Sequence, residues 1–155
     1  PSQLLRNIDG KRFEDATPLA GVAFMTPIVG RGLAVGDINN DGRPDVVTID
    51  SFGGVHIYAN DNTASGAWIG LKLIGTKSTR DGSGAIVTIK AGGKTFVRHA
   101  HTDGSYMSAS DGRVIVGLGQ VSGPVDVSIR WPSGLTQQLK QQPVGSYITV
   151  TEGAK

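Results

Sequence analysis

Residues 37–45 carry oxygen-bearing side chains at a spacing that suits a hard metal ion. The stretch reads Asp-Ile-Asn-Asn-Asp-Gly-Arg-Pro-Asp. Its first, third, fifth and ninth positions are Asp37, Asn39, Asp41 and Asp45. Ca²⁺ takes about six to eight oxygen ligands, whereas Mg²⁺ demands near-ideal octahedral geometry and keeps its waters. Because Gly42 allows a tight turn, the spacing predicts a Ca²⁺ loop, with the backbone carbonyl of Arg43 as a further ligand.

The segments on either side of this loop have the composition of strands. Residues 33–35 and 46–49 are short β-prone runs. A Ca²⁺ loop between two helices places a bidentate Glu at its twelfth position, but the twelfth residue here is Thr48. The sequence therefore predicts a Ca²⁺ loop that joins two strands. The alternative is an acidic turn that uses Asp, Asn and Gly only for turn chemistry.

Composition points to an all-β chain. The 155 residues allow one medium domain or two small ones. Glycine is abundant, with 23 residues that punctuate short β-branched runs, and this pattern is typical of many tight turns between strands. Cysteine is absent, so the fold must be held by its core and, we expect, by metal. The chain begins at Pro1 without Met, and we expect it to be a piece of a longer protein.

The charge and hydropathy of the sequence argue against nucleic-acid binding and against membrane insertion. The formal net charge of +2 is small, the basic residues are interspersed and aromatic residues are sparse, so we expect no nucleic-acid binding. No apolar run approaches the roughly 18 residues of a transmembrane segment. We therefore expect no membrane insertion.

A polar, turn-prone stretch at 60–66 separates two differently patterned halves. We place one unit at residues 1–62 and a second at 66–153. The second half contains seven short runs typical of strands, at 68–74, 85–90, 95–101, 113–116, 125–131, 136–140 and 146–151. Their spacing predicts an antiparallel β-sandwich or barrel, with a hairpin turn at Gly92-Gly93. No segment shows a sustained helical period, so helix should be nearly absent.

The first half resembles the FG-GAP repeat, also called VCBS, of integrin-type β-propellers. The resemblance rests on Gly32-Leu-Ala-Val-Gly-Asp-Ile-Asn-Asn-Asp-Gly-Arg-Pro-Asp-Val-Val, on a preceding hairpin at 5–15 and on a closing strand at 54–61. In that family the repeat is a propeller blade and the loop oxygens bind a structural Ca²⁺. A propeller needs about four to eight blades, and this chain has room for one and a fraction. The resemblance implies neighbouring blades of a longer parent chain.

The second half, residues 68–152, resembles the ASPIC/UnbV domain, which follows FG-GAP repeats in large secreted proteins such as cartilage acidic protein. The matching motifs are Trp-Ile-Gly-Leu-Lys-Leu at 68–73, Gly-Thr-Lys-Ser-Thr-Arg-Asp-Gly-Ser-Gly-Ala at 75–85, Gly-Ser-Tyr-Met-Ser at 104–108, Gly-Leu-Gly at 117–119 and Trp-Pro-Ser-Gly at 131–134. The chain departs from the family at Thr79, Ser83, Ala109 and Ile115-Val116. The resemblance implies an architecture and an extracellular setting rather than an activity.

Catalytic constellations are not recognisable. There is no Cys nucleophile, and Ser133 lies in Trp-Pro-Ser-Gly, which predicts a tight turn rather than a nucleophile elbow. His99, His101 and Asp103 alternate along a predicted strand and its end, so they form a second candidate metal site. A solvent-facing strand edge followed by a turn is the alternative.

Two further groups could contact a ligand. Trp68, Tyr106 and Trp131 could form an aromatic platform for a sugar, although Trp131 could equally cap the core. Arg80 and Asp81 lie in a glycine-rich turn that could hold an anion or could be purely structural. We therefore predict these five residues as candidate ligand contacts.

We expect a calcium-loop, blade-like β repeat packed on or linked to an antiparallel β-sandwich or barrel. Its expected function is that of a non-enzymatic, secreted or cell-surface Ca²⁺-binding module for structural support and for recognition of a protein or glycan. The alternatives are a carbohydrate-binding accessory module of a polysaccharide-active enzyme, with its catalytic domain elsewhere, and a hydrolase that uses Asp103, His99 or His101.

Packing between the halves is a further expectation. A β fragment of 62 residues alone buries too little surface to be comfortably stable. We therefore expect residues 1–62 to dock their apolar side chains onto the sandwich. The residues predicted to make this contact are Phe13, Leu33, Val35, Val47, Ile49 and Ile57.

Overall fold

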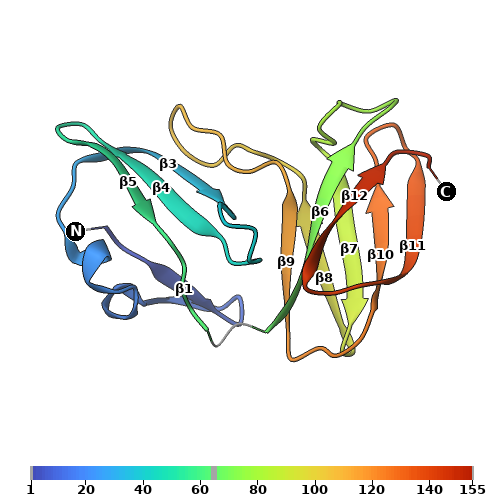
Figure 1. Cartoon of the computed structure of the whole chain (residues 1–155), viewed down its shortest axis with the longest axis horizontal. Coiled ribbons are helices and arrows are strands. Elements are labelled where there is room, and N and C mark those ends of the chain that lie inside the picture. The colour runs from blue at the N-terminus through green and yellow to red at the C-terminus, as the bar shows by residue number, and fades with distance from the viewer. Residues whose placement is uncertain (1, 64–65, 155) are drawn as a thin grey trace.

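The structure, a computed structural model, describes residues 2–63 and 66–154, and it confirms an all-β chain (Figure 1). In the first half, β1 (Leu5–Ile8) and β2 (Arg12–Asp15) form a hairpin. Two short 3-10 helices follow, η1 (Thr17–Leu19) and η2 (Val22–Met25). An antiparallel sheet is then built from β3 (Gly30–Gly36), β4 (Asp45–Asp50) and β5 (Gly54–Tyr58). No helix among the described residues is long and apolar enough to cross a membrane.

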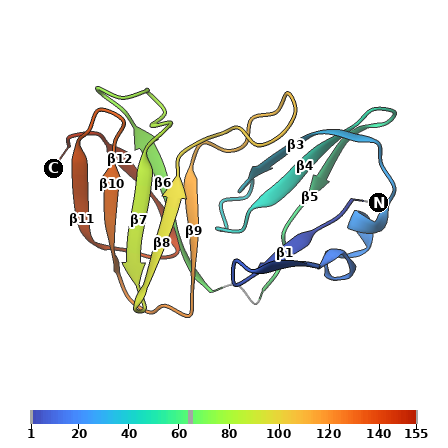
Figure 2. The same ribbon diagram turned by 180° about the vertical axis from the view of Figure 1, so that it is seen from behind.

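The second half is a sandwich of two sheets (Figure 2). One sheet has the order β11-β10-β7-β8, from β11 (Thr136–Gln142), β10 (Val125–Arg130), β7 (Ile86–Ala91) and β8 (Lys94–His99). The other has the order β12-β6-β9, from β12 (Ser146–Thr151), β6 (Ala67–Ile74) and β9 (Val114–Gly119). All pairs are antiparallel except β12 with β6, which is parallel. The expected sandwich is confirmed, apart from this one parallel pair.

Turn chemistry explains the tight hairpins. Gly92 and Gly93, between β7 and β8, have φ angles of +54° and +72°. Asp9 and Gly10, between β1 and β2, have φ angles of +53° and +69°. Positive φ at both central residues is the type I′ geometry, which matches the right-handed twist of the flanking strands. The predicted Gly-Gly hairpin therefore forms as expected.

The hydrophobic core lies in the second half. Its strands alternate, so that Ile69, Leu71 and Leu73 of β6 point inward toward Val127 and Ile129 of β10. Every buried hydrophobic side chain of the described residues lies between positions 69 and 150. The first half thus contributes nothing to the core.

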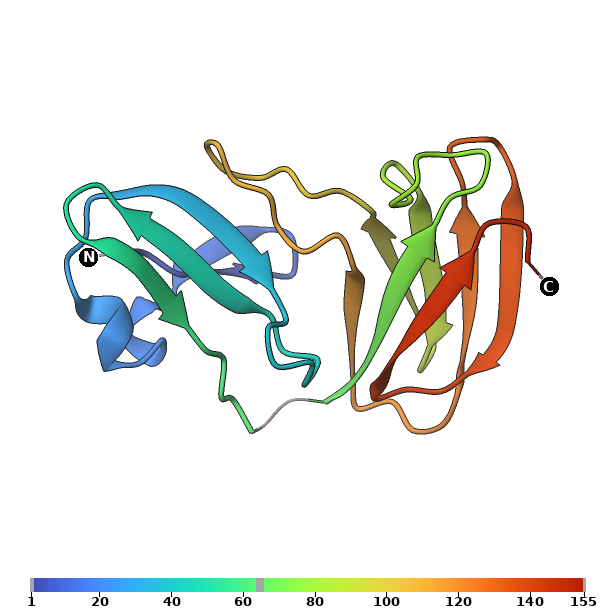
Figure 3. The same cartoon turned by 45° about the horizontal axis from the view of Figure 1, so that its top comes forward.

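The two halves meet through a long segment between β8 and β9, which reaches across to β3 (Figure 3). The backbone N–H groups of Leu33 and Val35 each donate a 3.2 Å hydrogen bond, to the hydroxyls of Ser105 and Ser110. The N–H of Asp111 donates to the carbonyl of Val35 at 2.9 Å. A strand edge left open invites pairing with other chains, and this segment covers the free edge of β3.

The halves do contact each other, but the prediction that residues 1–62 dock onto the sandwich through apolar side chains is wrong. Phe13 is 66% exposed and Ile57 is 64% exposed, and Leu33, Val35 and Ile49 are exposed as well. Polar contacts from the β8–β9 segment and from the acidic loop hold the first half instead. The apolar faces of the β3–β4–β5 sheet therefore remain largely uncovered.

Candidate functional site

The acidic loop connects β3 to β4, which are paired where Gly36 faces Asp45. Asn40 and Gly42 have φ angles of +61° and +83°, and these two left-handed residues curl the backbone into a tight loop. The N–H of Asp41 donates to Oδ1 of Asp37 at 3.0 Å, and the N–H of Gly42 donates to Oδ2 at 2.7 Å. The side chain of Asp37 therefore lies inside the loop, wrapped by its backbone.

Asp45 closes the other end of the loop. Its carboxylate accepts the N–H of Ile38 at 2.9 Å and the N–H of Asn60 at 2.8 Å. Asp37 and Asp45 are each only 2% exposed. Neither carboxylate forms an ion pair with any residue that the structure describes. Buried charges are normally paired or bound to metal, so the donor set fits a cation that would offset these two charges.

Asp41 differs from the two buried carboxylates because it has a cationic partner. Its carboxylate pairs with the guanidinium of Arg43 and accepts the amide N–H of Asn39 at 2.6 Å. Within the described part of the chain, no three acidic or histidine side chains converge closely enough to form a metal cluster as they stand. Of the three predicted carboxylate ligands, Asp41 is therefore the one that forms an ion pair with a described residue, Arg43.

Tyr147 and Trp68 bring the second half against this loop. The hydroxyl of Tyr147, on β12, donates to Oδ2 of Asp37 at 2.5 Å. The indole of Trp68, on β6, packs against Gly42 so closely that a Cβ at this position would overlap it. The two rings meet edge to face with their centroids 5.1 Å apart. Burial, and then the bond to Asp37, raises the pKa of Tyr147 above its usual value, so the phenol stays a donor.

Arg113, just before β9, forms the second link to the loop. Its Nη2 donates to the backbone carbonyl of Asp37 at 2.7 Å, and its Nη1 donates to Oδ1 of Asn40 at 2.5 Å. The guanidinium also pairs with Asp111 and lies 4.2 Å from the ring centroid of Tyr147. Burial alone would raise the pKa of Asp111, but the hydrogen bonds from Arg113 outweigh it and hold that pKa below its usual value.

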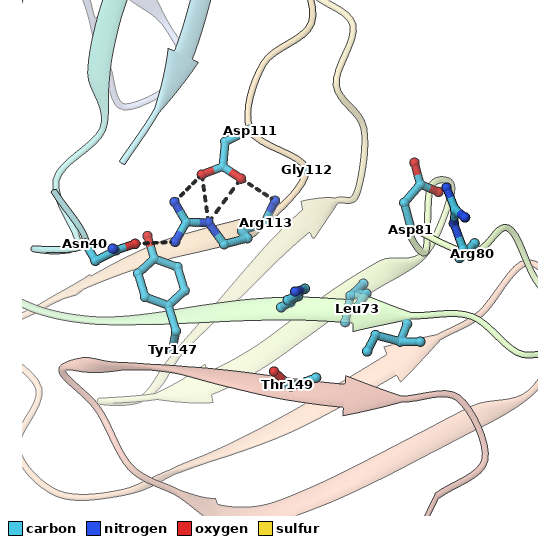
Figure 4. A pocket seen from close by; sticks show the side chains of 11 residues that line it. Asn40, Leu73, Arg80, Asp81, Asp111, Gly112, Arg113, Tyr147 and Thr149 are labelled. Carbon is cyan, nitrogen blue, oxygen red and sulfur yellow. Dashed lines mark hydrogen bonds and ion pairs between the residues drawn. The ribbon is translucent and has the colours of Figure 1, made fainter. Parts of the chain in front are cut away.

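A groove of about 850 Å³ opens beside this junction, on the outer face of the β12-β6-β9 sheet (Figure 4). Its lining comes from the acidic loop, the sheet, the turn after β6 and the end of the β8–β9 segment. The lining residues are Asn40, Lys72, Leu73, Ile74, Arg80, Asp81, Asp111, Gly112, Arg113, Tyr147 and Thr149. Arg80 and Asp81, predicted as ligand contacts, both lie here. The N–H and then the hydroxyl of Ser83 hold the pKa of Asp81 below its usual value.

The predicted aromatic platform is not assembled. Trp131 is 2% exposed, lies in the core and donates its Nε1–H to Oε1 of Gln137 at 3.1 Å, so the interpretation of Trp131 as a core residue holds. Trp68 is partly covered by the acidic loop. Tyr106 is 69% exposed on the segment beside β3. The three rings therefore offer no shared surface.

The second candidate metal site is only partly formed. Nδ1 of His101 lies 2.8 Å from Oδ1 of Asp103, and the Asp103 side chain is 91% exposed. His99 is exposed at the end of β8. No metal cluster among the described residues includes these histidines.

Ser133 lies in the expected turn, where the N–H of Gly134 donates to the carbonyl of Trp131 at 2.9 Å.

Glu152 was not found by sequence reasoning, and it closes the far end of the sandwich. Its Oε2 accepts the N–H groups of Thr76, Lys77 and Ser78, each at 2.8 Å. Its Oε1 accepts the hydroxyls of Ser78 and Ser133, at 2.9 and 2.5 Å. Burial alone would raise the pKa of Glu152, but these hydrogen bonds outweigh it and hold that pKa far below its usual value. The two turns that it joins therefore have a structural role.

Comparison with known families agrees with this arrangement of loop and sandwich. The ASPIC and UnbV model matches residues 75–155, and the chain belongs to that family. An FG-GAP-like repeat model matches residues 37–92, which include the whole acidic loop. Both kinds of domain occur in cell-surface and extracellular proteins. No curated protein matches the chain.

Proposed function

We propose that this chain is a non-enzymatic module of an extracellular protein, in which Ca²⁺ bound to residues 37–45 stiffens the joint between the repeat and the sandwich. The observation that carries the proposal is the burial of the Asp37 and Asp45 carboxylates, neither of which forms an ion pair with a described residue. Tyr147 ties the first of these carboxylates to the second half. A cation there would offset charge at the contact between the halves.

The ligands would be the side chains of Asp37, Asn39, Asp41 and Asp45 and the backbone carbonyl of Arg43. FG-GAP repeats commonly bind Ca²⁺, and oxygen donors of this kind suit a hard cation. When bound, the ion supplies positive charge and rigidity rather than a reactive centre. Ca²⁺ binding would therefore be linked to folding, because a group that binds only the native state stabilises it.

The division into units at 1–62 and 66–153 belongs to the same proposal, and it suggests a partner for the first unit. Ile49, Val55 and Ile57 share one face of the β3–β4–β5 sheet and are 47%, 60% and 64% exposed. Exposed apolar faces of this kind mark contact surfaces. Neighbouring repeats of a longer chain would cover this face, while the sandwich and its groove would recognise a protein or glycan.

A carbohydrate-binding accessory module of a polysaccharide-active enzyme is the second candidate function. It is favoured by one observation, the groove beside the acidic loop, whose lining includes charged, amide and hydroxyl side chains. The two candidates share the same Ca²⁺ joint and differ in whether a catalytic domain belongs to the parent protein.

Isothermal titration calorimetry with CaCl₂ on the chelator-treated chain tests the proposal. We expect one Ca²⁺ per chain, and Asp41→Ala should weaken its binding more than tenfold because it removes a charged ligand. Asp61→Ala, which removes an exposed carboxylate outside the loop, is the matched control and should bind as the wild type does. Absence of binding heat in the wild type, together with coincident unfolding curves in Ca²⁺ and in chelator, would contradict the proposal.

A further inference from the structure

We infer that the groove beside the acidic loop binds an acidic saccharide, with its anionic group on Lys72 and Arg80. This inference rests on the proposed role in recognition and narrows it from a protein or glycan to one ligand class. The groove has the size of a small-molecule site, since such sites commonly measure about 300–1,000 Å³ and this one measures about 850 Å³.

Lys72 and Arg80 are the cationic side of the site. Lys72 lies on the outer face of β6. Arg80 lies on the turn that follows this strand (Figure 4). Both are exposed, and neither forms an ion pair with a described residue. Arg113, by contrast, is occupied by Asp111 and the acidic loop. The groove therefore offers a carboxylate or sulfate two cations that have no anionic partner among the described residues.

Two carboxylates stand in the same groove and narrow the ligand class. The carboxylate of Asp81 accepts the N–H and the hydroxyl of Ser83, at 3.2 and 3.0 Å, and the carboxylate of Asp111 pairs with the guanidinium of Arg113. An ionised carboxylate only accepts hydrogen bonds. Because Asp81 has no cationic partner among the described residues, a peptide rich in Asp and Glu would meet like charge there, whereas the hydroxyls of a sugar are donors.

The remaining lining also suits a sugar. Asn40 and Thr149 add an amide and a hydroxyl, and Ile74, partly buried on the same face of β6 as Lys72, adds an apolar side chain. Ligand sites typically combine apolar lining with a few placed polar groups. Asn40 comes from the acidic loop and is held by Arg113 at 2.5 Å. The wall of the groove is therefore part of the joint that Ca²⁺ is proposed to stiffen.

The test is a titration followed by two-dimensional NMR and calorimetry, with a disaccharide containing one hexuronic acid as the probe. Its neutral counterpart and a monosulfated disaccharide are the comparison ligands. We expect the acidic disaccharides to shift the backbone signals of groove residues and to bind at least tenfold more tightly than the neutral one. The uronate and sulfate arms distinguish which anionic group is preferred.

Two variants locate the site. Lys72→Ala and Arg80→Ala should each weaken binding of the acidic disaccharides about tenfold or more, because both side chains are exposed and their removal leaves the core intact. Lys94→Ala, which removes an exposed cation on β8 outside the groove, should bind as the wild type does.

Equal affinity for the neutral and acidic disaccharides, no binding at millimolar concentration, or tighter binding of an Asp- and Glu-rich peptide would each overturn the inference. These outcomes leave the proposed Ca²⁺ joint intact, because its own test is the binding of Ca²⁺ to the chain without sugar. Conversely, a chain that binds the acidic disaccharide but not Ca²⁺ would contradict the proposed Ca²⁺ site and support saccharide binding in the groove.

Discussion

The phenol of Tyr147 donates a 2.5 Å hydrogen bond to the carboxylate of Asp37, across 110 residues of sequence. This bond joins β12 of the sandwich to the first residue of the acidic loop. Because the side chain of Asp37 is almost wholly buried, the phenol is one of the few donors that compensate its charge. The acidic loop is therefore both the candidate metal site and part of the contact between the two halves.

Tyr147→Phe removes this donor while it keeps the ring that packs against Trp68. We expect the free energy of unfolding to fall by about 1–3 kcal/mol, as for loss of a hydrogen bond to a charged, buried group. Chemical denaturation measures the change. Tyr106→Phe, at a ring that is 69% exposed, is the control. A Tyr147→Phe variant as stable as the wild type would contradict the assigned role of this bond.

Gly42→Ala tests the close approach of the loop to the sandwich. The new Cβ would overlap the indole of Trp68, and the residue would have to keep a φ of +83°. We expect a loss of about 1–3 kcal/mol from overpacking in addition to the cost of the left-handed conformation, about 1–2 kcal/mol. Gly10→Ala is the matched control, since its φ is +69° and no atom of the described residues lies within 4 Å of its Cβ position. Equal losses in the two variants, measured by thermal unfolding, would contradict the contact.

Glu152→Gln tests the acid dependence of stability. The folded-state pKa of Glu152 lies below the usual value of 4.5. The charged carboxylate therefore stabilises the fold fully above that pH, and this contribution is lost as the pH falls below it toward the folded-state pKa. We expect the variant to be less stable than the wild type at pH 7, with the two melting temperatures converging as the pH falls below about 4.5.

The control for this acid dependence is Glu14→Gln, at a carboxylate that is half exposed and whose one ion pair among the described residues is with Arg12. Its melting temperature should follow that of the wild type at every pH. A constant difference between Glu152→Gln and the wild type from pH 7 to pH 3 would show that the charge of Glu152 is not what stabilises the fold.

Local patterns were enough to predict most of the strands and the acidic loop. Alternation of apolar and polar residues predicted runs at 68–74, 125–131 and 146–151, and the structure has strands at Ala67–Ile74, Val125–Arg130 and Ser146–Thr151. The oxygen spacing of residues 37–45 located the loop between β3 and β4. These features depend on neighbours in sequence, so a single sequence is sufficient to find them.

Contacts between distant segments could not be predicted in this way. The segment between β8 and β9 has no alternation of apolar and polar residues. Its contacts with β3 through Ser105 and Ser110 therefore could not be predicted from a sequence pattern. Arg113 and Glu152 likewise act on residues about 75 positions away. The prediction of apolar docking was wrong because it assumed that exposed apolar side chains of the first half, such as Ile57, would be covered within this chain.

Thermal unfolding of the whole chain in excess Ca²⁺ and in chelator tests the Ca²⁺ joint most directly. Ca²⁺ at one hundred times its dissociation constant should stabilise the wild type by about 2.7 kcal/mol. At the same Ca²⁺ concentration, the resulting rise in melting temperature should fall by about half or more in Asp41→Ala, whose binding is more than tenfold weaker, and should be kept in Asp61→Ala. Unfolding curves of the wild type that coincide in Ca²⁺ and in chelator would contradict a structural role for Ca²⁺ in this protein.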